Sequence, residues 1–164
     1  MTAPLPTHWA LPARPSGQHS ATVRELYLPA PAGADRDASS RHQLATRNFL
    51  AWLYDRPLVG KTLGTALVDV MDQAQMHRPN DIAANKRDMF AYLDRRGYMD
   101  FRECVDHALA ALHLAESYQM ESLWVNAFSH CVGMHHALPA SIEFDVSDFS
   151  VHGVRRIVLT LSRL

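Results

Sequence analysis

The strongest constraint on the fold is a run of apolar residues with helical spacing in the middle of the chain. They fall at positions i, i+3, i+4, i+7, i+8 and i+11: Leu63, Ala66, Leu67, Val70, Met71 and Ala74. This is the period of an α-helix that buries one face. The opposite face carries polar residues, among them Asp69 and Asp72. The segment therefore predicts an amphipathic helix that must pack against other elements.

Four further segments repeat the pattern and predict a mainly α domain with about five helices. We expect them at residues 40–54, 81–96, 106–118 and 121–132. Ser40 and Gln43 have the spacing of a capping box at the start of the first of these, and Pro57 stops it. Gly97 is typical of a helix end, since glycine readily takes a positive φ. On the helix at 81–96, we expect Ile82 to be buried.

The last two predicted helices are separated only by a break between Ser117 and Glu121. Helices joined by so short a turn must fold back on each other or cross steeply. We expect the Tyr118 hydroxyl to bond across this turn, and Gln119 to cap it. Trp124 and Phe128 are expected in the core.

The two ends of the chain differ from its middle. Six of the nine prolines precede residue 32, which forbids a helix there. We expect a disordered tail at residues 1–20, a short extended segment at 22–28, and a half-buried strand at 142–146, where apolar residues alternate. Residues 154–161 combine helical spacing with strand-forming composition; we favour a helix, with a strand as the alternative. The predicted organisation is a tail (1–20), a domain (21–138), and a strand plus C-terminal helix packed on it (139–164).

Composition narrows the classes of function. The chain is 48% hydrophobic and 20% charged with a formal charge of −1, which argues against a general electrostatic grip on nucleic acid or anionic lipid. No segment approaches the roughly 20 apolar residues needed to span a bilayer, and the N-terminus has no apolar run of signal-peptide length. Its two cysteines are too few for a disulfide framework. We therefore expect an intracellular protein, cytoplasmic or nuclear.

Two stretches resemble BTB/POZ domains. The segment from Asp88 to Cys131 is similar to their C-terminal half, whose helical hairpin matches at Leu112, Ala115, Tyr118, Gln119, Met120 and Leu123. In the earlier stretch HQLATRNFLAWL, the matching positions are His42, Ala45, Arg47 and Phe49. Together with RPLVGKTLGTAL and AFSHCVGM, these stretches also resemble a group of uncharacterised filamentous-fungal proteins with a BTB-like region. The likeness covers roughly residues 41–134.

The resemblance implies a BTB-like helical core and a function in protein–protein contact. BTB domains place a β-hairpin before the first helix, but here that region is rich in proline and offers one plausible strand. We therefore expect a small or reduced β-sheet. The segment at 58–75 is also longer than the resemblance implies between the corresponding helices.

Three motifs suggest chemistry, and each has a simpler interpretation. VGKTLG (59–64) contains the Gly-Lys-Thr of a phosphate-binding loop, but Asp55 stands where that loop needs glycine, so we expect an ordinary helix start. SHCVGMHH (129–136) gathers metal-ligand types, but on a helix His130 and His135 would project about 140° apart. Cys131 neighbours His130, yet it falls on a buried stripe where a thiol loses nucleophilicity.

We therefore predict no catalytic residue, no cofactor and no metal site. His107 and His113 are six positions apart, so they cannot share a ligand on one helix. The predicted function is a protein–protein interaction module without catalysis, acting on a protein partner or through self-association, including a homodimer, with no nucleic acid or membrane. The alternative is a small intracellular enzyme or ligand-binding domain that uses His42, Arg47 and Asp55.

Overall fold

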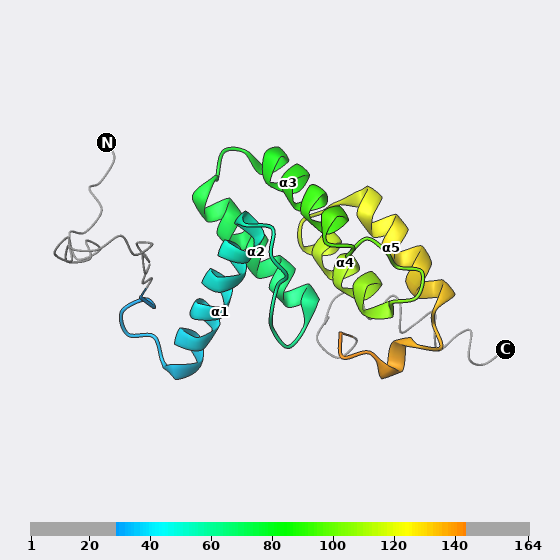
Figure 1. Cartoon of the computed structure of the whole chain (residues 1–164), viewed down its shortest axis with the longest axis horizontal. Coiled ribbons are helices and arrows are strands. Elements are labelled where there is room, and N and C mark those ends of the chain that lie inside the picture. The colour runs from blue at the N-terminus through cyan, green and yellow to red at the C-terminus, as the bar shows by residue number, and fades with distance from the viewer. Residues whose placement is uncertain (1–28, 144–164) are drawn as a thin grey trace, which may run out of the picture.

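The computed structural model describes residues 29–143, which form five α-helices and a short 3-10 helix (Figure 1). The elements are α1 (Arg36–Leu53), α2 (Leu63–His77), α3 (Ile82–Arg95), α4 (Val105–Ser117), α5 (Glu121–Gly133) and η2 (Leu138–Ala140). The predicted mainly helical class with about five helices is confirmed. Residues 29–143 contain no strand, and none of their helices is long and apolar enough to cross a membrane. The predicted tail at 1–20 and the elements at 22–28 and 154–161 lie outside this range.

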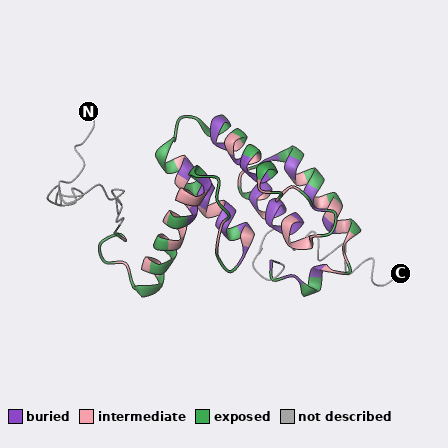
Figure 2. Cartoon of the chain, viewed as in Figure 1, coloured by how far each residue is buried: buried purple, intermediate pink, exposed green. Residues whose placement is uncertain are grey.

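The helix α4 forms the centre of the fold. It packs against α2 on one side and α5 on the other, while α1 packs against α2 at one end of the molecule (Figure 1). Seven of its residues are buried: Ala108, Leu109, Ala110, Ala111, Leu112, Leu114 and Ala115. Figure 2 shows the buried residues gathered on α2 and α4. Four of the seven are alanines, so the neighbouring helices can approach the α4 backbone closely.

Residues from α3 and α5 complete the core. Met89, Tyr92 and Leu93 of α3 are fully buried, and the Tyr92 hydroxyl donates a 2.7 Å hydrogen bond to the Arg56 carbonyl. The prediction that Ile82 is buried is wrong. Its side chain is 45% exposed, because it occupies the first residue of α3, before the helix reaches its neighbours.

The first helix begins earlier than its sequence pattern predicts. It starts at Arg36, where the Asp35 carboxylate accepts a 2.7 Å hydrogen bond from the Ala38 amide. The predicted capping box at Ser40 is therefore wrong, and Ser40 lies within the helix. Aspartate caps a helix as well as serine does, and its charge also favours the N-terminal end of the helix dipole.

Three helices end in one backbone arrangement, the Schellman motif. The residues with positive φ are Asp55 after α1 (52°), Gly97 after α3 (73°) and Gln119 after α4 (51°). In each, the next residue's amide donates to the carbonyl five positions earlier, at 2.7, 2.9 and 2.8 Å respectively. The prediction that Gly97 ends its helix is confirmed. Gln119 closes the turn after α4 through its backbone conformation. The Tyr118 hydroxyl does not bond across that turn but donates to Asp72 on α2.

A buried asparagine fastens the α1–α2 loop to α1. Asn48 is fully buried, and its amide Nδ2 donates to the Val59 carbonyl at 2.7 Å. The Val59 amide in turn donates to Asn48 Oδ1 at 3.0 Å. The side chain thus offers the loop the same donor and acceptor pair as a neighbouring strand would.

Residues 138–143 are tied to α2 and α4 by polar contacts. The Glu143 carboxylate accepts hydrogen bonds from the amides of Leu63 and Gly64 at the start of α2, the latter at 3.1 Å. The Ser141 hydroxyl donates to Asp106 on α4. The burial expected for a strand is reversed at its two described residues, since Ile142 is 59% exposed and Glu143 is buried. The backbone amides at the start of α2 need a hydrogen-bond acceptor, and the Glu143 carboxylate turns inward to supply it.

At Gly64, α2 lies close to α4, and this contact predicts the effect of substituting the glycine. A methyl group on Gly64 would lie 3.0 Å from both Glu143 Oε2 and His113 Nδ1, and 3.3 Å from Ala110 Cα. Overpacking of this kind outweighs the better helix propensity of alanine. We expect Gly64→Ala to lower the free energy of unfolding by about 1–2 kcal/mol in chemical denaturation.

Gly133 supplies a matched control, since it also lies in a helix but has no atom within 4 Å of the added methyl. Gly133→Ala should raise stability by up to about 1 kcal/mol, the ordinary propensity gain. A gain of the same size for Gly64→Ala would show that the contact between α2 and α4 is looser than described.

Candidate functional site

A cleft of about 490 Å³, which we call the α1–α3 cleft, lies between α1, the end of α2 and α3. It is lined by Phe49, Trp52, Leu53, Ala74, His77, Arg78, Asp88, Ala91 and Arg95. Both α1 and α3 pack against α2. The cleft is therefore the space left where α1 and α3 diverge.

Three rings are among the lining residues of the cleft, those of Phe49, Trp52 and His77, and Trp52 is buried. The Phe49 ring stacks on the His77 ring with centroids 5.0 Å apart, and it tilts against Trp52 at 5.7 Å. The Arg78 guanidinium lies 5.9 Å from the Trp52 ring centroid, within range of a cation–π contact. These rings give the cleft a largely apolar surface that suits apolar or ring-shaped groups.

The charged residues of the cleft are paired with each other. Arg78 Nη2 lies 2.8 Å from Asp88 Oδ2, and Arg95 Nε lies 3.4 Å from Asp55 Oδ1. All four side chains are about half exposed, so each pair contributes at most about 1 kcal/mol to stability. Arg78, Asp88 and Arg95 line the cleft, whereas Asp55 stands beside it.

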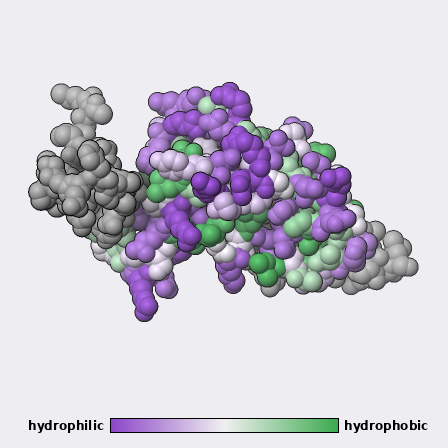
Figure 3. Space-filling model, in the orientation of Figure 1, coloured by the Kyte–Doolittle hydropathy of each residue, from purple (hydrophilic) through white to green (hydrophobic). Residues whose placement is uncertain are grey.

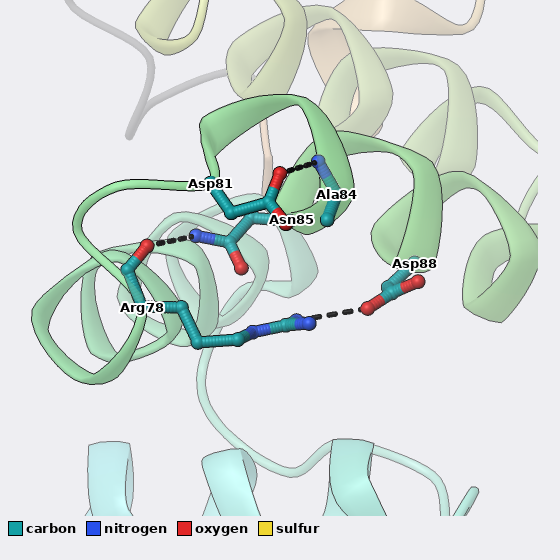
Figure 4. Close-up of polar contacts among 5 residues, drawn as sticks. All are labelled: Arg78, Asp81, Ala84, Asn85 and Asp88. Atoms are coloured by element: carbon teal, nitrogen blue, oxygen red, sulfur yellow. Dashed lines mark hydrogen bonds and ion pairs between the residues drawn. The ribbon is translucent and has the colours of Figure 1, made fainter.

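The loop that carries Arg78 is held in place from α3 (Figure 4). The Asn85 side chain donates a 3.2 Å hydrogen bond to the Arg78 carbonyl, and Asp81 caps α3 through the Ala84 amide at 3.0 Å. Asn85 is buried, which restricts its motion. The loop thereby presents the Arg78 side chain toward Asp88 and α1.

Exposed apolar side chains stand at the open edge of the cleft. Leu53 lines it and is 56% exposed, and the following Tyr54 is 75% exposed. Both come at the end of α1, where the helix leaves the core. Figure 3 shows one face of the molecule, on which apolar patches are interspersed with hydrophilic surface.

A second hollow, of about 740 Å³, lies between α1 and α2. Arg41, His42, Lys61 and Asp69 are among its residues. Burial raises the pKa of Asp69, the nearby Asp72 carboxylate raises it further, and Arg41 opposes both. We call this hollow the α1–α2 groove.

The structure separates the three residues of the alternative enzyme hypothesis. His42 lines the α1–α2 groove, whereas Asp55 is paired with Arg95 beside the α1–α3 cleft. Arg47 is exposed and lines neither hollow. A common catalytic centre for these residues is therefore not formed.

The Gly-Lys-Thr segment leads into a helix start, as expected. The amides of Leu63 and Gly64, which would face a phosphate in a phosphate-binding loop, donate to the Glu143 carboxylate. Burial raises the pKa of Glu143 and the nearby Asp106 raises it too, while the two amide bonds lower it. The α2 N-terminus thus already has a hydrogen-bond acceptor from within the chain.

The histidines of the motif at 129–136 and of α4 make different contacts, and only His135 and His136 lie ring to ring, with centroids 5.8 Å apart. The His130 ring meets Phe101 edge-on at 5.6 Å, and His135 Nδ1 lies 3.2 Å from the Val132 carbonyl. His107 packs edge-on against Tyr98, and burial lowers the pKa of His113. Within residues 29–143, no group of three or more histidine, cysteine or acidic side chains could hold a metal ion.

The cleft includes residues that the sequence did not single out. Phe49 and Trp52 belong to the apolar band of the first helix, and Trp52 is buried in the core. His77 and Arg78 lie beyond the predicted apolar run of α2, which ends at Ala74. The pairing of Arg78 with Asp88 spans ten positions and two helices. Helical periodicity does not predict an ion pair between residues so far apart. The sequence does indicate where α3 begins, because Asp81 is a good N-cap residue.

A family model described as a domain of unknown function, DUF8004, matches residues 86–162. The matched region begins within α3 and includes α4, α5 and η2. No curated protein and no solved structure matches the chain.

The two cysteines should differ in reactivity. Cys131 is fully buried, and burial raises the pKa of its thiol to about 12, while Cys104 is partly exposed. At pH 8 the Cys131 thiolate is therefore too scarce to react. With a disulfide reagent such as DTNB, we expect one thiol to react in the native protein and the second only after denaturation. Two fast thiols would contradict the packing of α5.

Proposed function

We propose that this chain is a protein–protein interaction module without catalytic activity, and that the α1–α3 cleft receives an apolar segment of the partner. The observation that carries the proposal is the aromatic lining of the cleft next to the exposed Leu53 and Tyr54. Apolar side chains grouped at an open cleft are typical of protein contact sites. The partner is another protein or a second copy of the chain, in an intracellular compartment.

We propose in addition that the helical core is of the BTB/POZ kind, with α4 and α5 as its hairpin. Leu112, Ala115, Met120 and Leu123, which carry the resemblance, are all buried in the hairpin. A role in contact rather than catalysis is the expectation that goes with that family. The reduced sheet belongs to the same proposal.

The alternative, a small enzyme or ligand-binding domain, has less support. Its three residues lie apart: His42 lines the α1–α2 groove, Asp55 is paired with Arg95, and Arg47 lines neither hollow. The groove is the place where such an activity would have to be sought, and His42 is the residue to substitute first.

Two substitutions with matched exposure test the interaction proposal. Leu53→Asp places a charge in the apolar edge of the cleft, while Val125→Asp does so on α5, where the side chain is 53% exposed against 56% for Leu53. We expect Leu53→Asp to lose at least tenfold in recovery of a partner cross-linked and purified from the native organism, or in self-association by light scattering. Val125→Asp should behave as the unaltered protein.

Circular dichroism and thermal unfolding provide the folding control, and both variants should keep the helical content and melting temperature of the unaltered protein. Equal losses for both variants, or no loss for Leu53→Asp, would remove the cleft as the contact site.

A further inference from the structure

We infer that the α1–α2 groove binds a small molecule that carries a phosphate or carboxylate group and several hydroxyl groups. The groove shares no lining residue with the α1–α3 cleft, so this site goes beyond the proposed function and can fail independently of it. Its volume of about 740 Å³ is within the range of small-molecule sites, about 300–1,000 Å³. Of the three residues in the alternative hypothesis, only His42 lines it, so the site depends on a different set of side chains.

Two cationic side chains from different elements line the groove. Arg41 comes from α1 and Lys61 from the loop before α2, and within residues 29–143 neither side chain forms an ion pair. In the α1–α3 cleft, by contrast, Arg78 and Arg95 are both paired with aspartates. The α1–α2 groove therefore offers two positive charges to a ligand, and hydrogen bonds between charged groups are among the strongest that proteins make.

The loop that carries Lys61 is fastened to α1 close to Arg41. Asn48, which is buried and lines the groove, exchanges two hydrogen bonds with the backbone of Val59, at 2.7 and 3.0 Å. A Cβ atom on Gly60 would lie 3.8 Å from Leu44 Cδ2, and Leu44 comes about one helical turn after Arg41. The backbone beside Lys61 is thus held near Arg41, so both long side chains can reach one anionic group.

The α2 wall of the groove supplies partners for hydroxyl groups. Thr62 is 5% exposed, and its hydroxyl donates a 2.9 Å hydrogen bond to Thr65 Oγ1. Thr65 is exposed in the groove, and after accepting this bond it keeps its own hydroxyl proton for another acceptor. Further along α2, Asp69 accepts hydrogen bonds, and Gln73 both donates and accepts them.

The Asp69 carboxylate also determines which anions suit the groove. It repels a bare anion, whereas a hydroxyl group on the body of a ligand can donate to it. Its position on α2 is seven residues, or about two helical turns, beyond Thr62. A molecule with an anionic group at Arg41 and Lys61 and hydroxyl groups along α2 therefore matches the groove better than an inorganic anion does.

An NMR titration of the full chain tests the inference, with a hexose monophosphate, inorganic phosphate and a poly-glutamate peptide as probes. We expect the hexose monophosphate to shift the amide signals of residues 41–45 and 60–65. Inorganic phosphate should bind about tenfold more weakly, because it lacks the hydroxyl groups that bond to the α2 wall. The poly-glutamate peptide should not compete with the hexose monophosphate.

Substitutions of single charges connect the signal shifts to the groove. Arg41→Gln and Lys61→Gln should each weaken binding of the hexose monophosphate about tenfold or more, since each removes a charged hydrogen-bond donor. Arg47→Gln is the matched control, because Arg47 is an exposed cation of α1 that lines neither hollow. It should bind as the unaltered protein does, and circular dichroism should show the same helical content in all three variants.

Four results would overturn the inference. Equal weakening in Arg47→Gln would mean that general surface charge attracts the ligand, and equal affinity for both phosphates would mean that hydroxyl groups are not recognised. Binding of the poly-glutamate peptide alone would assign the groove to an acidic protein segment. Absence of shifts with both phosphates would remove the site. Leu53→Asp should leave binding of the hexose monophosphate unchanged, so the groove and the α1–α3 cleft are tested separately.

Discussion

The close packing of α4 between α2 and α5 is the constraint on which the rest of the structure depends. The buried alanines of α4 let the neighbouring helices approach its backbone, and Gly64 on α2 meets Ala110 where the helices are nearest. Because the residues at this crossing have small side chains, the backbones of the two helices contact each other closely. Such close packing leaves the helices little room for movement. The Glu143 carboxylate at the same point fixes the start of α2 and ties residues 138–143 to the core.

This arrangement explains why the candidate site lies where it does. The helix α4 is packed on both sides, by α2 and α5, whereas α1 has α2 and the loop held by Asn48 as its main support. Its C-terminal turn extends past the core and leaves Leu53 and Tyr54 exposed. The loop between α2 and α3, which carries Arg78, forms one side of the cleft. The α1–α3 cleft thus lies beside the part of the molecule that α2, α4 and α5 form by close packing.

The sequence predicts the parts of this structure that depend on neighbouring residues. Helical spacing located all five helices, and Gly97 marked the end of α3, because both signals are local. Ser40 was misread because a capping box can also occur inside a helix, while Asp35 a few residues earlier does the capping. The pairing of Glu143 with the amide of Leu63 spans 80 positions, and no local pattern reports it. The same limit applies to the cleft, where Phe49 meets His77 only after α1 and α2 have packed.

Amide hydrogen exchange followed by NMR tests the central role of α4 most directly. Residues buried at the centre should open only when the whole domain unfolds, whereas a peripheral helix opens locally at lower free energy. The account predicts that the amides of residues 109–114 exchange most slowly, with a free energy of opening equal to that of global unfolding, and that α1 amides exchange faster. If α4 amides exchange as fast as those of α1, the fold is not organised around α4.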